Sequence, residues 1–195
     1  MPGTVTTPFL MMDPGFLWHA PAGTAFPTLG GTAAGSKFTD APSATFVEVG
    51  ATEDGHRFRY APSIEAVSVA EFLDPVKWRT VSREGSFAFN LADYTLKNLQ
   101  RALNGGTLTS TGSGATQVNK LTPPGLGAET RSALMWESAD STMRIFMYST
   151  VNVAEMETAF NKAPAIAVLP CEFRFEIDGS GNIFDVYGTN TRLGV

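Results

Sequence analysis

The sequence predicts a mainly β protein: an antiparallel β-sandwich or barrel with one short flanking α-helix at about 95–103, an extended N-terminal arm and a long Gly/Ser/Thr-rich loop. Three observations predict this class. Apolar and polar residues alternate in several short runs, turn residues separate these runs, and a single segment has the spacing of an amphipathic helix. With 195 residues, of which 43% are hydrophobic, the chain is long enough to bury one core.

Five short strands are expected in the first half of the β domain, at residues 45–49, 56–60, 64–70, 76–83 and 86–91. Their alternation is clearest where Phe58 and Tyr60 share one face and the flanking arginines occupy the other. Asp54-Gly55 and Glu84-Gly85 supply turn residues between strands. The pattern is typical of an antiparallel meander.

A short helix is expected next. Asp93 stands where an N-cap residue belongs, and leucines at positions 96, 99 and 103 recur at i, i+3 and i+7. The run Asn104-Gly105-Gly106 is typical of a helix end. These features predict one amphipathic helix packed on the sheet.

The last third of the chain returns to strands. Residues 131–138 and 141–150 are expected to form a hairpin around Ala139-Asp140. Two further strands, at 165–177 and 183–187, flank the turn sequence Asp-Gly-Ser-Gly.

The chain divides into an arm, residues 1–45, and a single β domain, residues 46–195, into which the loop 104–130 is inserted. The arm has too many large apolar residues for a disordered segment: Phe9, Leu10, Met11, Met12, Phe16, Leu17, Trp18, Phe26, Leu29 and Phe38. Burying ten such side chains is worth on the order of 15–25 kcal/mol before ordering costs. We therefore expect the arm to dock on a neighbouring subunit, with Phe9, Phe16, Leu17 and Trp18 in the contact; the alternative is that it folds back over its own core.

The turn at residues 71–75 gives a second indication of assembly. Polar residues are usual between two strands, but Phe72 and Leu73 occupy this tip. Exposed apolar tips mark contact surfaces. The alternative is a turn tucked under the helix.

Charge and residue counts exclude several functions. A net charge of −5 argues against a protein that grips nucleic-acid phosphates. Cys171 is the single cysteine, so no internal disulfide is expected, and with two histidines a four-ligand Cys/His zinc site cannot form. We expect no metal, no cofactor, no secretory signal and no membrane-spanning segment.

Catalytic motifs are also missing. Gly30 and Gly35 have the spacing of a phosphate-binding loop, but the Lys-Ser order is wrong. Cys171 and His56 lie on apolar strand faces and are expected to be packing residues, and no Gly-x-Ser-x-Gly elbow occurs. The sequence therefore favours a protein that is not an enzyme.

The run from Val47 to Gly106 carries a resemblance. It begins with the strand that ends in Val49-Gly50-Ala51-Thr52-Glu53-Asp54-Gly55, passes through Ile64-Glu65-Ala66-Val67 and Asp74-Pro75-Val76-Lys77, and continues with Arg83-Glu84-Gly85-Ser86-Phe87-Ala88-Phe89. It closes with the helix Thr95-Leu96-Lys97-Asn98-Leu99-Gln100-Arg101-Ala102-Leu103. This order resembles the major tail protein, the tail tube subunit, of long-tailed non-contractile bacteriophages. The resemblance is close over about 60 residues, and elsewhere concerns only the general plan.

The resemblance implies a structural virion protein. Six copies would form a ring, rings would stack into the tail tube around a tape-measure protein, and tail terminator and distal tail proteins would be further partners. Phage DNA would pass through without specific binding. The protein would be assembled in the host cytoplasm and located in the virion tail. The family implies no catalytic residues, and it would place Phe72, Leu73, Asp74, Lys77 and Trp78 in a hairpin that reaches a neighbouring subunit.

Two other interpretations stay open. One is another self-assembling phage protein, such as a head decoration or head-to-tail completion protein. The other is a carbohydrate-binding β-sandwich module that uses Trp18, Trp78 and Trp136.

Overall fold

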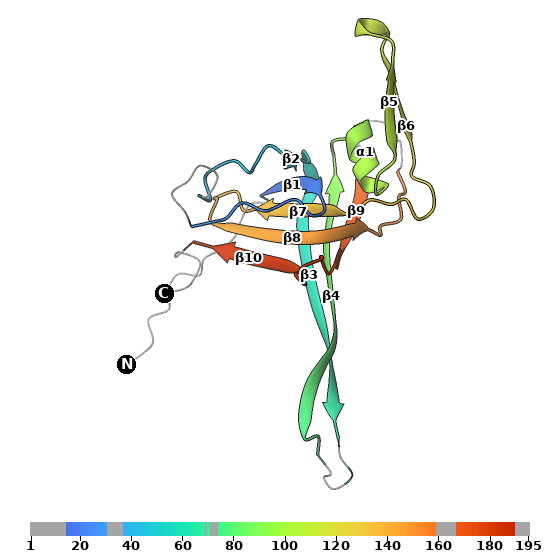
Figure 1. The fold of residues 1–195 in the computed structure, drawn as a ribbon. Helices are drawn as coiled ribbons and strands as arrows, with labels where there is room; N and C mark the ends of the chain where they lie inside the picture. The colour runs from blue at the N-terminus through green and yellow to red at the C-terminus, as the bar shows by residue number, and fades with distance from the viewer. Residues whose placement is uncertain (1–14, 31–36, 69, 71–73, 159–166, 190–195) are drawn as a thin grey trace.

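The computed structural model describes residues 15–30, 37–68, 70, 74–158 and 167–189 (Figure 1). In these residues the fold is mainly β, with antiparallel sheets and a single α-helix, consistent with a β-sandwich; the predicted fold class is confirmed. The elements are β1 Phe16–Pro21, β2 Val47–Glu48, β3 Thr52–Val67, β4 Lys77–Leu91, α1 Leu96–Ala102, β5 Thr107–Thr111, the 3₁₀ turn η1 Gly114–Thr116, β6 Val118–Thr122, β7 Ser132–Glu137, β8 Met143–Asn152, β9 Leu169–Glu176 and β10 Phe184–Gly188.

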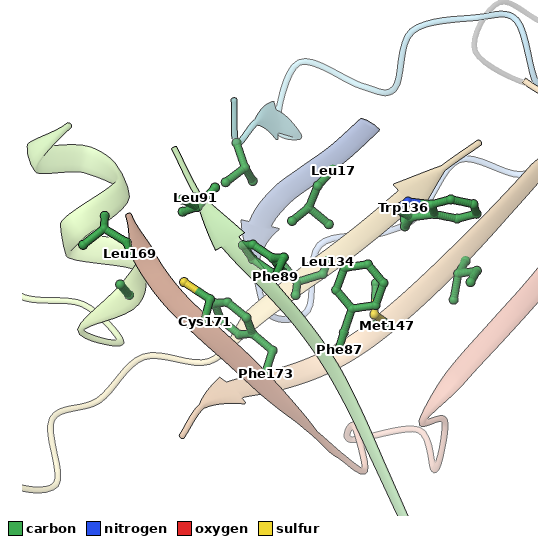
Figure 2. Close-up of a cluster of buried hydrophobic side chains, with 13 residues drawn as sticks. Leu17, Phe87, Phe89, Leu91, Leu134, Trp136, Met147, Leu169, Cys171 and Phe173 are labelled. Atoms are coloured by element: carbon green, nitrogen blue, oxygen red, sulfur yellow. The ribbon is translucent and has the colours of Figure 1, made fainter. Parts of the chain in front are cut away.

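One eight-stranded sheet has the order β2-β1-β7-β8-β9-β4-β3, and β10 pairs with the part of β8 that β9 leaves free. Strands β5 and β6 form a separate hairpin. The large sheet bends over itself, so that β4 and β9 cross over β1, β7 and β8 (Figure 2). The main apolar core lies between these two parts of the sheet.

The main core is dense in aromatic side chains. Its buried members are Leu17, Val49, Phe87, Phe89, Leu91, Ala102, Leu134, Trp136, Ile145, Met147, Leu169, Cys171 and Phe173. Phe89 and Phe173 stack with ring centroids 5.8 Å apart across β4 and β9. The alternation of strand residues puts every second side chain into this cluster.

A second apolar cluster covers the opposite face of β7 and β8. It is formed by Ala20, Phe46, Ala133, Met135 and Phe146, with Trp18, Phe26, Leu29 and Tyr187 packed against it. Strand β7 is therefore covered on both faces, and all six of its residues are buried. The covering side chains include Phe26 and Leu29 of the predicted arm, Phe46 directly after it, and Tyr187 of β10.

A buried arginine fastens the segment 37–46 to this second cluster. Arg144 has no exposed surface and pairs with Glu137 at 3.0 Å between Nη2 and Oε2. The same nitrogen donates to the carbonyl oxygens of Phe38, at 2.8 Å, and Asp40, at 2.6 Å. A buried charge is tolerated because it has these partners.

The N-cap of helix α1 lies two residues later than predicted. Its N-cap is Thr95, whose Oγ1 accepts a hydrogen bond from the backbone N–H of Asn98 at 3.2 Å. The backbone carbonyl of Asp93 instead accepts a hydrogen bond from the side-chain amide of Asn98, at 2.9 Å. The predicted helix end is correct, because Asn104 and Gly105 both have positive φ, 56° and 119°.

Two predicted turns are wrong, and four predicted strands form two: 56–60 and 64–70 join across Pro62 in β3, and 76–83 and 86–91 join in β4. Gly55, with φ of 73°, lies at a register shift between Thr52 and His56 within β3, so it forms a bulge and not a turn. Gly85 lies within the continuous strand β4. A Cβ atom there would lie 2.3 Å from Cδ2 of Phe175, so the glycine makes room for that ring.

The predicted arm and loop also need correction. Residues 16–21 form β1 inside the sheet, hydrogen-bonded between β2 and β7, and are not a separate arm. Within the inserted loop 104–130, β5 and β6 form a hairpin that projects past α1 (Figure 1). Both changes satisfy backbone polar groups that an unpaired segment would leave to water.

Candidate assembly surface

The hairpin of β3 and β4 extends far beyond the rest of the sheet (Figure 1). Residues 86–91 of β4 pair with β9, but residues 77–85 pair with β3 alone. We call residues 60–67 and 77–85 the blade. A two-stranded hairpin with no third strand is marginally stable in water, so the blade has little packing of its own to support it.

The blade has one apolar face. Ile64 lies opposite Thr80 and Ala66 lies opposite Trp78, and residues opposite each other share a face. Trp78 is 65% exposed, Ile64 53% and Tyr60 41%. Along β3 this face carries only apolar or aromatic residues, and Arg83, opposite Pro62, is the charged residue that β4 adds to it. A row of exposed apolar residues of this kind is unusual for an isolated molecule.

The other face of the blade is charged. Glu65 lies opposite Arg79, and Lys77 lies opposite Val67. A register shift between Ser63 and Ile64 inserts one extra residue into β4 and re-aims the side chains beyond it. The blade is therefore amphipathic, as a strand pair is when it covers another surface.

The apolar face is continuous with the main core. The ring of Tyr60 meets that of Phe184 edge-on at 5.5 Å, and Phe58 meets the same ring at 5.2 Å. Phe58 lies opposite Phe87, which is fully buried. The row of apolar side chains on the core face of β3 thus continues along the blade, where it is exposed to solvent.

The predicted contact residues have different positions in the structure. Trp78 and Lys77 lie on the blade, on its apolar and charged face respectively, and Asp74 is exposed just beyond the blade. Phe16 is 47% exposed at the start of β1. Phe9, Phe72 and Leu73 lie outside the described residues.

The position of Leu17 contradicts its predicted role in a contact with a neighbouring subunit. Its side chain is 2% exposed and belongs to the main core of its own chain, so it is not available to a neighbouring subunit. Trp18 points to the other face of β1 and packs on the second cluster. The alternative, that this part of the arm folds back over its own core, is what the structure shows for these two residues.

The sheet also offers an open strand edge, which the sequence alone did not reveal. Strand β3 pairs only with β4 among the described elements, so its outer edge is unpaired over 16 residues. Unpaired edges are templates for another strand. Proline at position 62 and charged residues along β3 are the usual devices that limit indiscriminate pairing.

Of the residues considered for chemistry, Cys171 is buried in the main core and His56 is partly buried against it. Burial raises the pKa of the Cys171 thiol to about 12, which keeps it protonated and a poor nucleophile. His56 stacks on Phe87 with centroids 5.5 Å apart. Within the described ranges, no group of three His, Cys, Asp or Glu side chains is placed to hold a metal ion.

The three tryptophans do not form a common platform. Trp136 is 5% exposed in the main core, Trp18 packs on the second cluster and Trp78 lies on the blade. A sugar ring that stacks on several aromatic faces at once has no site among them.

The chain matches no protein-family model, and no curated protein matches it in sequence. In the described part of the chain, no helix has the length and apolar character that crossing a membrane requires.

Proposed function

We propose that this chain is a structural subunit that assembles with identical copies, and specifically a tail tube subunit of the long-tailed phage type, forming hexameric rings that stack into a conduit. The observation that carries the proposal is the amphipathic blade, whose apolar face is exposed along its whole length. The family resemblance of residues 47–106 gives the particular architecture.

The exposed apolar face supplies a driving force. Fully burying a large apolar side chain is worth about 1.5–3 kcal/mol, and Trp78, Ile64 and Tyr60 are each about half exposed. Their burial would contribute on the order of 3 kcal/mol per blade. Such a contribution is modest for one contact but accumulates in a closed ring, where every copy makes and receives the same contact.

The shape suits head-to-tail association. The blade and the β5–β6 hairpin project from opposite ends of the sheet (Figure 1). Contacts between two different surfaces of the same chain generate rings or stacks, whereas a single self-complementary patch stops at a dimer. The open edge of β3 offers a second, hydrogen-bonded contact between neighbours.

The charge balance suits a conduit for DNA. Six copies with a net charge of −5 would give a ring about −30. An acidic wall repels phosphates and lets a duplex slide, whereas a basic wall would bind it through counterion release. We propose that DNA passes without specific binding. A tape-measure protein, a tail terminator and distal tail proteins are the further proposed partners, in the virion tail.

Electron microscopy and light scattering of the purified chain test the proposal. We expect rings or tubes about ten nanometres across, as packing of several domains around an axis suggests. The double variant Ile64→Ser/Trp78→Ser should remain monomeric with an unchanged far-UV spectrum. The matched control Ile177→Ser/Val186→Ser removes two similarly exposed apolar residues outside the blade and the β5–β6 hairpin and should assemble normally.

Two outcomes would count against the proposal. A wild-type chain that stays monomeric at all concentrations would remove the assembly function. Closed oligomers that never stack would favour the alternative of a head decoration or head-to-tail completion protein.

A further inference from the structure

A row of long cationic side chains crosses the face of the sheet that points away from the main core. Arg59 on β3 and Arg174 on β9 both lie directly opposite Ser86 of β4, which stands between them. Adjacent strands are about 4.8 Å apart, so the two arginine backbones are separated by about 10 Å. The short serine leaves open space between the two long side chains.

This space is a cleft of about 130 Å³ at the root of the blade. Its lining residues are Arg59, Arg83, Glu84, Gly85, Ser86, Glu172, Arg174 and Phe175. Three arginines, one from each of three strands, therefore line a single small cavity, although Arg83, opposite Pro62, starts from the other face of β4 than Ser86. At the neighbouring position on the same face, Ala88 lies between Arg57 and Glu172. These two side chains have opposite charges, so cations are not in excess there.

The three guanidinium groups have no protein partner in the described ranges. The ion pairs there are Arg131 with Glu176 and Arg144 with Glu137, and no hydrogen bond from Arg59, Arg83 or Arg174 is present. The two acids that border the cleft, Glu84 and Glu172, lie beyond ion-pair distance. Like charges that face one cavity repel each other, and an anion between them removes that repulsion.

The chemistry of the cleft selects an oxyanion. Guanidinium is planar and donates two parallel N–H bonds, which match the two oxygens of a carboxylate or phosphate. A side-chain hydroxyl on the floor, Ser86, adds a short donor between the two arginines.

We propose that this cleft binds an oxyanion, and that in the assembled protein the oxyanion is an exposed carboxylate of a second copy of the chain. The second part depends on the proposed function. Charge complementarity argues for it, because the chain has 19 acidic residues against 14 basic ones. Exposed acids such as Glu155 and Glu157 make no ion pair with any described residue. The cleft is also continuous with the blade, since Gly85 belongs to both.

The test compares Arg59→Gln/Arg174→Gln with Arg57→Gln, a matched control on the same face of β3 that lies outside this cleft. We expect the double variant to raise the critical concentration for assembly about threefold to fivefold per arginine at 50 mM NaCl. The difference should shrink at 500 mM NaCl because salt screens exposed pairs. We expect the control to assemble like wild type.

Inorganic phosphate tests the cleft independently of assembly. At constant ionic strength, millimolar phosphate should shift the arginine side-chain NMR signals of the monomeric Ile64→Ser/Trp78→Ser variant, and Arg59→Gln/Arg174→Gln in that background should abolish the shift. No shift would overturn the oxyanion site, whether or not the chain assembles. A shift with unchanged assembly of the double variant would overturn the carboxylate of a second copy as the occupant. A wild-type chain that never assembles would overturn the proposed function and with it this occupant.

Discussion

Replacing Arg144 should be among the most damaging single changes in this protein. Arg144→Met removes the cation that pairs with Glu137 and leaves that carboxylate in a site where only 10% of its side chain is exposed. Breaking a buried pair from one side costs about 3–5 kcal/mol, because an uncompensated charge stays in the interior. Domains of this size have about 5–15 kcal/mol of total stability, so the loss is a large fraction of it.

The second change separates the charge from the packing. In Glu137→Gln/Arg144→Met no buried charge remains, while the carbonyl oxygens of Phe38 and Asp40 still lose their donor. Leaving two part-buried carbonyls without partners costs about 1–3 kcal/mol in all. The double variant should therefore be more stable than Arg144→Met alone by about 2 kcal/mol.

Urea unfolding followed by tryptophan fluorescence measures these free energies. Hydrogen exchange adds a local test, because the Phe46 amide donates to the carbonyl of Ser43 within the fastened segment, at 2.9 Å. We expect Arg144→Met to accelerate exchange at Phe46 more than at Phe87 in the main core. A cost below about 1 kcal/mol for Arg144→Met, or a double variant as unstable as the single one, would refute the reasoning.

Three further predictions concern stability. Burial lowers the pKa of His19 to about 4, and the nearby Arg101 adds to the effect. The folded protein therefore keeps His19 neutral, whereas the unfolded chain binds a proton below a pH of about 6.5. The free energy of unfolding in urea should fall by on the order of 3 kcal/mol from pH 6.5 to pH 4, and His19→Gln should remove that part of the pH dependence. Gly85→Ala should cost about 1–3 kcal/mol in thermal unfolding because its Cβ meets the ring of Phe175, whereas Gly179→Ala, with open space around it, should be near neutral. Leu17→Ala should cost about 2–5 kcal/mol but the neighbouring Phe16→Ala less than about 1 kcal/mol, and equal costs would contradict the placement of β1 in the core.

Strand periodicity and helix signals were enough to predict the fold class. Alternating side chains predicted the strand face that contains Phe87 and Phe89, because a period of two is a local property of extended chain. Leucine spacing and the Asn-Gly-Gly end predicted α1, because capping depends on adjacent backbone groups. The contact role of the tip at 71–75 stays a prediction, because Phe72 and Leu73 lie outside the described residues.

The glycines show why local patterns were insufficient elsewhere. Gly85 has the same sequence signature in a turn and in a strand that needs room for a ring, and Phe175, 90 positions away, decides between them. The extent of the blade followed from this choice, since a turn at Gly85 would have divided β4.

The sequence by itself determined that the protein is mainly β, that residues 56–60, 86–91 and most of 141–150 are extended, and that a short helix lies near 95–103. Only the tertiary structure decided that Leu17 is buried in its own chain while Trp78 is not, that β3 lies at the sheet edge, and that Arg59, Arg83 and Arg174 share one cleft. The physical reason is that propensity and periodicity act over a few residues. Edges, clefts and burial depend on contacts between segments that the chain order does not specify.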